Sequence, residues 1–174
     1  MNFERFTTLS LMVIAAAASR LLPHPYNFTP IAAVALFSGA EFERKKLAFL
    51  VPFAALLLSD AIIGFYSAME MMVTYLGFAA VVCIGFTIRG RDNALNAGFA
   101  TLAGAVTFFL ITNCAFFINP GLYPQNMNGL VQGYTAGLPF FRNTLTSDIF
   151  YSTLLFGGFA LAQKRFAGLR LAAA

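Results

Sequence analysis

Few residues of this chain could do polar chemistry, and four charged ones stand in or beside long apolar stretches. These are Arg20, Asp60, Arg142 and Asp148. An ionisable side chain in apolar surroundings is costly unless it is paired or used, so such residues mark candidate functional sites. Two roles are open to them. They could bind a polar ligand, or the two aspartates could pair with the two arginines and only fix the packing of helices.

Four further polar residues complete the candidate site. His24 lies between two prolines, where a loop-fixing role and a ligand role are both open. Asn113 could bind a ligand or merely bridge helices. The full set of candidate substrate-binding residues is Arg20, His24, Asn27, Asp60, Asn113, Tyr123, Arg142 and Asp148.

The residue types of this set suggest how a ligand would be held. The arginines would bind an anionic or carbonyl group. The aspartates would orient the arginines or accept hydrogen bonds from ligand donors. Aromatic side chains would stack on a ring of the ligand, and the candidates for this are Tyr26, Phe28, Tyr66 and Tyr134.

The residue types needed for most catalytic and metal chemistry are missing. One His and two Cys, Cys83 and Cys114, provide no CxxC pair and no set of metal ligands. No HExxH, P-loop or GxGxxG motif occurs. We therefore expect no catalytic residue, no metal and no cofactor, and we do not expect an enzyme. Nucleic acid is not an expected partner either, because no basic run carries interleaved aromatics.

The composition identifies the solvent in which these residues lie. Of 174 residues, 59% are hydrophobic and only 10% are charged, with a mean hydropathy of +0.75. A soluble chain of this length could not hide so much apolar surface. The composition excludes a soluble domain, a disordered chain and a disulfide-stapled secreted scaffold. It predicts an all-α integral membrane protein with the lipid bilayer as its main partner.

Six apolar stretches could cross a membrane, and they predict a six-helix transmembrane bundle. The second is short at 13 residues, or about 20 Å of helix. A polar loop over 119–139 is expected before the last helix. The spans cover 6–22, 30–42, 47–66, 69–88, 95–118 and 141–163, so that 1–166 forms one transmembrane domain and 167–174 a short, loosely held cytoplasmic tail.

The basic residues predict the orientation of this bundle. With both termini in the cytoplasm (N-in, C-in), nine of the eleven Lys and Arg residues fall inside, and only Arg20 and Arg142 lie outside. The candidate site residues then gather in the outer leaflet, which predicts a pocket open to the outer face of a bacterial inner membrane. Cleavage of the first helix as a signal peptide, after Ala16-Ala17-Ala18, is an alternative that leaves the rest of this topology unchanged.

The sequence resembles a known class of transport protein. The residues that show this resemblance are the run from Arg20 to Pro30, then Leu58-Ser59-Asp60, Ile111-Thr112-Asn113, Leu122-Tyr123-Pro124 and the run from Pro139 to Leu145. Over nearly the whole chain these are similar to an uncharacterised family of bacterial membrane proteins. That family resembles the S components, or substrate-binding subunits, of energy-coupling factor vitamin transporters. The resemblance implies an S-component-like fold and a small-molecule ligand. It also implies transport either alone or with an ATP-driven coupling module as a partner.

These observations together favour one function and leave two others open. The favoured one is capture and uptake of a small vitamin-like or cofactor-precursor molecule through an outer pocket. A non-transporting structural subunit of a larger membrane complex would instead keep its outer charges paired and dry. A proton-coupled carrier, the weakest alternative, would use Asp60 or Asp148 as a relay.

Overall fold

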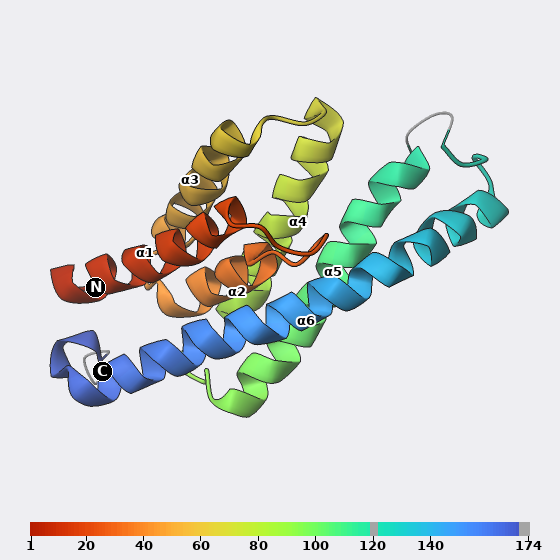
Figure 1. The fold of residues 1–174 in the computed structure, drawn as a ribbon. Coiled ribbons are helices and arrows are strands. Elements are labelled where there is room, and N and C mark those ends of the chain that lie inside the picture. The colour runs from red at the N-terminus through yellow and green to blue at the C-terminus, as the bar shows by residue number, and fades with distance from the viewer. Residues whose placement is uncertain (119–121, 171–174) are drawn as a thin grey trace.

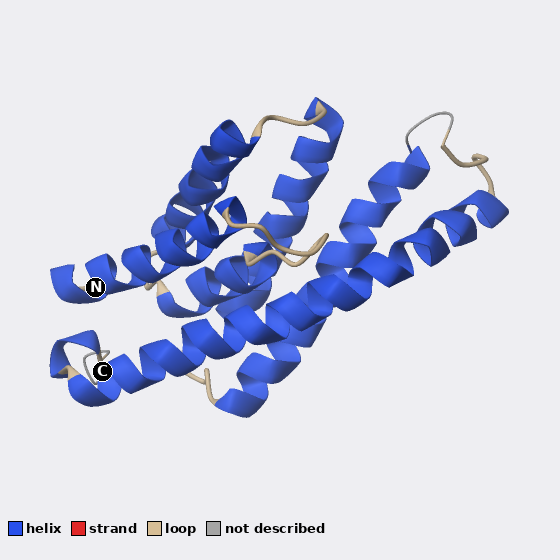
Figure 2. Ribbon diagram, in the orientation of Figure 1, coloured by secondary structure: helices blue, strands red, loops and turns tan. Residues whose placement is uncertain are grey.

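The computed structural model of the protein describes residues 1–118 and 122–170, and every regular element in this part of the chain is a helix (Figures 1 and 2). The all-α prediction is therefore confirmed. The elements are α1 (Phe3–Ala18), the 3₁₀ turn η1 (Ser19–Leu21), α2 (Ile31–Glu41), α3 (Lys45–Ile63), α4 (Ala68–Thr87), α5 (Ala94–Ile118), α6 (Met127–Arg165) and the 3₁₀ turn η2 (Ala167–Leu169).

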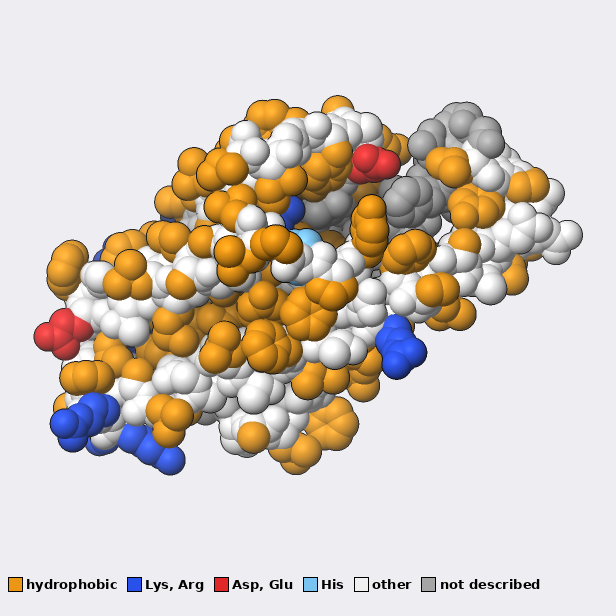
Figure 3. Space-filling model, viewed as in Figure 1, with side chains coloured by type: hydrophobic (Ala, Val, Ile, Leu, Met, Phe, Trp, Pro, Cys, Tyr) orange, Lys and Arg blue, Asp and Glu red, His pale blue; other side chains and the backbone are white. Residues whose placement is uncertain are grey.

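Four helices, α3, α4, α5 and α6, are long and apolar enough to cross a membrane. Large apolar side chains cover much of the outer surface of the bundle, as Figure 3 shows for one face. Surface of this kind suits lipid rather than water. These features indicate a helical membrane protein. The helices α1 and α2 are shorter, with 16 and 11 residues.

The short helix α2 forms the centre of the bundle and contacts each of the other α-helices. All of its residues from Ala32 to Glu41 are buried. A helix that is apolar on every side is stable only when neighbours surround it. Glycines permit the closest of these contacts, since a Cβ on Gly39 would overlap the carbonyl oxygen of Val82 in α4. A Cβ on Gly85 would likewise overlap the carbonyl oxygen of Leu36 in α2.

The helix α6 is much longer than the sequence predicted. It has 39 residues, which correspond to about 58 Å, and it continues through Pro139. Most of the polar loop predicted over 119–139 is therefore wrong. The residues from Met127 onward are helical, with Asn126 as the N-cap whose side chain accepts a hydrogen bond from the Gly129 N–H. Residues 119–121 of that predicted loop lie outside the described residues.

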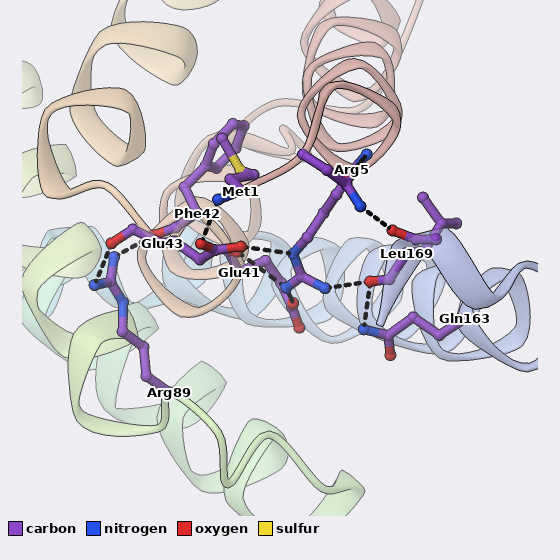
Figure 4. Close-up of polar contacts among 10 residues, drawn as sticks. Met1, Arg5, Glu41, Phe42, Glu43, Arg89, Gln163 and Leu169 are labelled. Carbon is purple, nitrogen blue, oxygen red and sulfur yellow. Dashed lines mark hydrogen bonds and ion pairs between the residues drawn. The ribbon is translucent and has the colours of Figure 1, made fainter. Parts of the chain in front are cut away.

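A buried ion pair connects α1 to α2 at the end of the bundle where both termini lie (Figure 4). Arg5 of α1 is 2% exposed, and its Nη2 lies 2.7 Å from Oε2 of Glu41 at the end of α2. The same guanidinium donates to the Glu41 carbonyl at 3.1 Å and to the Leu169 carbonyl at 2.5 Å. Neither Arg5 nor Glu41 belongs to the candidate residues that the sequence singled out.

A second arginine serves the free carbonyls at the end of α2. Arg89, which follows α4, donates from Nε to the Gly39 carbonyl at 2.8 Å, from Nη1 to the Glu43 carbonyl at 3.2 Å and from Nη2 to the Phe42 carbonyl. The last carbonyls of a helix have no partner within the helix and carry a partial negative charge. Arg89 therefore supplies both the hydrogen bonds and the charge that a buried helix end needs.

The segment after α6 makes more contacts with the rest of the chain than the sequence predicted. Leu169 is 4% exposed, and the Asn2 side chain donates to the Gly168 carbonyl at 2.6 Å. Residues 167–170 thus pack against α1 rather than forming a loose tail. Residues 171–174 lie outside the part that the structure describes.

We predict that Gly85→Ala lowers the stability of the protein, because the added methyl group would overlap the backbone of α2. The expected loss is about 1–3 kcal/mol, as for other overpacked helix contacts. Gly157→Ala is the matched control, since a Cβ there meets nothing within 4 Å. It should be neutral or slightly stabilising. Unfolding in detergent micelles by heat or by SDS measures both, and equal effects of the two substitutions would contradict the close contact.

We predict that Arg5→Met destabilises the protein by about 3–5 kcal/mol, because it leaves Glu41 buried without its partner. Arg165→Met, at an exposed position in the last turn of α6, should change stability by no more than about 0.5 kcal/mol. The double variant Arg5→Met, Glu41→Met should recover much of the loss, since apolar side chains can replace a buried pair. The same unfolding assay tests this, and a double variant no more stable than Arg5→Met would contradict it.

Candidate ligand-binding site

A cavity of about 600 Å³ lies at the end of the bundle away from the termini. Its wall comes from η1 and the segment that leads into α2, and from α4, α5 and the middle of α6. Figure 3 shows the surface hollowed between α4 and the pair formed by α5 and α6. The volume lies within the range of about 300–1,000 Å³ that is usual for small-molecule sites.

Five of the eight predicted site residues line this cavity, although the sequence separates them widely. They are Arg20, Asn27, Asn113, Tyr123 and Asp148. The other three, His24, Asp60 and Arg142, are not part of its wall. The structure therefore brings together most of the predicted set.

Arg20 and Asp60 form an ion pair behind the wall of the cavity. Nη1 of Arg20 lies 2.8 Å from Oδ1 of Asp60 and donates to Oγ of Ser59 at 2.5 Å. Tyr75 donates its hydroxyl to the other oxygen of Asp60 at 3.1 Å. Asp60 is 1% exposed, so this partner set satisfies a fully buried carboxylate. Here the pairing alternative from the sequence holds, and the two charges cancel.

Asp148 has no such partner. It is 1% exposed, and neither of its carboxylate oxygens makes a hydrogen bond of ordinary geometry with the described residues. The backbone N–H of Ala33 interacts with it weakly, without reaching that geometry. Ala33 lies in the first turn of α2, where the N–H groups are free and the helix carries a partial positive charge. The positive end of α2 thus faces a carboxylate that lines the cavity.

The alternative in which Asp148 pairs with Arg142 is not realised in the described part of the chain. Arg142 is exposed on α6, outside the cavity wall, and no ion pair joins it to any described residue. Its neighbour Asn143 donates instead to the Tyr26 carbonyl at 2.9 Å and holds the loop before α2 against α6. His24 is exposed in that loop, with Nδ1 3.1 Å from the Pro25 carbonyl. His24 therefore lies where a loop-fixing role suffices.

The apolar part of the wall comes largely from residues that the sequence did not single out. Of the four aromatic residues expected to stack on a ligand, only Tyr66 lines the cavity. The remaining aromatic wall is supplied by Phe108 and Phe109 of α5 and by Phe140 and Phe141 of α6. The rings of Phe109 and Phe141 lie 4.8 Å apart and form one continuous face. Burial, above all, raises the pKa of Tyr66, so its hydroxyl stays protonated at neutral pH.

The helix α6 has a glycine at every fourth position where it passes the cavity. This spacing is the sequence signal from which the longer helix could have been predicted. Gly129, Gly133 and Gly137 are all buried. A Cβ on Gly137 would overlap Oδ1 of Asn113 in α5, whereas one on Gly133 would make an ordinary contact of 3.6 Å with the Tyr123 ring. Such spacing lets two helices approach closely. It places Asn113 at the cavity wall, where its amide donates to the Phe109 carbonyl at 2.9 Å.

Nothing in the described wall suggests a metal centre, since no three His, Cys, Asp or Glu side chains gather anywhere in residues that the structure describes. The wall offers one carboxylate, one arginine paired with Asp60, the amides of Asn27 and Asn113, several threonine hydroxyls and aromatic rings.

We predict that the two outer arginines behave differently. Arg20→Met leaves Asp60 buried without its cation and should destabilise the protein by about 3–5 kcal/mol. Arg142→Met removes an exposed charge without an ion pair and should change stability by about 0.5 kcal/mol or less. Thermal unfolding of both variants in the same detergent compares them, and an Arg142 variant as unstable as the Arg20 variant would contradict this arrangement.

Comparison with known proteins gives one match. The model of a family described as a family of unknown function (DUF6580) matches residues 1–170. No curated protein and no solved structure matches the chain.

Proposed function

The chain belongs to DUF6580, a family of unknown function, and we propose that it captures a small molecule in its outer cavity for uptake across a membrane. The single observation that carries this proposal is the cavity of about 600 Å³ with the buried, unpaired carboxylate of Asp148 in its wall. A side chain kept only for packing is normally paired or hydrogen-bonded when it is buried. A buried carboxylate at a ligand-sized cavity is better explained by a ligand.

The proposed orientation is N-in and C-in with six crossings, in which α1 and α2 span the membrane with help from the segments beside them. Both termini and the connections that carry Arg44 and Arg89 lie at one end of the bundle, which supports this orientation through the positive-inside rule. The cavity then opens to the outer face of a bacterial inner membrane. Cargo of vitamin or cofactor-precursor size would suit its volume and its aromatic wall.

The S-component resemblance extends the proposal to the mode of transport. An S-component-like protein would pass its ligand inward with an ATP-driven coupling module or by itself. The groove between α1 and α3, of about 450 Å³ and almost wholly apolar in its lining, offers a surface for a lipid or a partner helix.

That groove also supports the second candidate function, a structural subunit of a larger membrane complex. The satisfied pair of Arg20 and Asp60 fits this alternative equally well. The two candidates differ at Asp148. In a purely structural subunit, the burial of this unpaired carboxylate would cost free energy and serve no function.

The test is whether the purified protein holds a small molecule in this cavity. Ala136→Phe fills it, because Ala136 lines the cavity and its side chain is exposed there. The neighbouring Thr135→Phe is the matched control, since Thr135 is exposed but is not part of the wall. Native mass spectrometry of the wild-type protein, and thermal shifts with a panel of vitamins and nucleobases, should detect a bound compound. Ala136→Phe should lose it and Thr135→Phe should keep it.

Two outcomes would contradict capture. One is a wild-type protein that carries no small molecule and gains no thermal stability from any compound of the panel. The other is a compound that Ala136→Phe retains as fully as Thr135→Phe does, since it would then bind elsewhere.

A further inference from the structure

We infer that the ligand of the outer cavity is a planar, largely apolar compound with a cationic, N–H-donating nitrogen, and that Asp148 is the residue that anchors it. This inference rests on the proposed function and names the substrate class of the same site. It departs from the expectation from sequence that arginines would anchor an anionic group.

The charges of the wall lead to this conclusion. In the described part of the wall only Arg20 and Asp148 are charged, and no Lys or His contributes. Nη1 of Arg20 is already engaged by Asp60 at 2.8 Å and by Ser59 at 2.5 Å. Since Asp60 cancels the charge of Arg20, the charge that the cavity presents is that of Asp148.

No side chain in the described structure competes for the carboxylate of Asp148. No described Lys, Arg or His lies within ion-pair distance of its carboxylate. The backbone N–H of Ala33, in the first turn of α2, lies nearby without making a hydrogen bond of ordinary geometry. A helix end provides no mobile counter-ion, and both carboxylate oxygens retain their capacity to accept hydrogen bonds.

The rest of the wall fits the body of such a ligand. Phe109 and Phe141, with ring centroids 4.8 Å apart, present aromatic surface on the side of α5 and α6. Aromatic rings bind planar groups by stacking and bind cations through their faces. The amide of Asn113 and the hydroxyl of Thr144 are neutral polar groups that can form hydrogen bonds with the ligand without adding charge.

Three commercial probes of nearly identical shape test the charge preference directly. Benzamidine is a cation at neutral pH, benzamide is neutral and benzoate is an anion. Ligand-observed NMR or calorimetry with the full-length protein in lipid nanodiscs gives their dissociation constants. The wild-type protein should bind benzamidine at least about tenfold more tightly than benzoate, with benzamide between them. Ala136→Phe should abolish binding of all three.

The variant Asp148→Asn identifies the residue responsible. It keeps the size of the side chain and removes its charge, so the preference for benzamidine should disappear while the affinity for benzamide changes less than about threefold. The order of the three probes on the wild-type protein needs no variant, and it decides the inference even where Asp148→Asn fails to fold.

The outcomes separate this inference from the proposed function. Equal or tighter binding of benzoate in the cavity overturns the cationic ligand and leaves capture standing. A preference for benzamidine that survives in a folded Asp148→Asn protein overturns the role of Asp148. Absence of binding by all three probes contradicts both the cationic ligand and a cavity that captures small aromatic compounds.

Discussion

The burial of both ends of α2 is the constraint on which the rest of the structure depends. A helix leaves four N–H groups and four carbonyl groups unpaired at its ends, and inside a membrane protein no bulk water can satisfy them. At the carboxyl end of α2 the chain supplies Arg89 to the free carbonyls and Arg5 to Glu41. At the amino end Asp148 lies near the first turn without an ordinary hydrogen bond to its N–H groups. Charged residues that are far apart in the sequence thus lie near the two ends of one short helix.

The length of α2 also creates the cavity. Eleven residues span about 16 Å, which is roughly half of a bilayer core of about 30 Å. The helices α5 and α6 continue beyond its first turn, and the cavity lies beside Ile31 and Ala32, with α4, α5 and the middle of α6 in its wall. The glycines of α6 hold that helix close to Asn113 and Tyr123, so the wall is continuous on one side. The short length of α2 thereby places the amino end of this helix, with its partial positive charge, beside a space that can hold a ligand.

The sequence predicted the helical class and most helix positions, because an apolar run of the right length has few alternatives in a chain of this composition. It also predicted five residues of the cavity wall, since costly polar groups in apolar stretches are few. It failed at α6, where Pro139 and polar residues such as Asn128 suggested a loop, although packing against α5 and Tyr123 compensates for them. It failed equally to assign partners. Arg20 and Arg142 look alike in sequence, and only the path of η1 and α6 shows that the first is partly buried and paired with Asp60 while the second is exposed.

The central claim is that Asp148 faces a ligand rather than a partner side chain. Electron density for the protein purified without added compounds tests it most directly. We expect density for a small molecule in the cavity, with a nitrogen within about 3 Å of a carboxylate oxygen of Asp148. A closed cavity in which Asp148 pairs with Arg142 or Arg20 would contradict a ligand-binding role for this carboxylate.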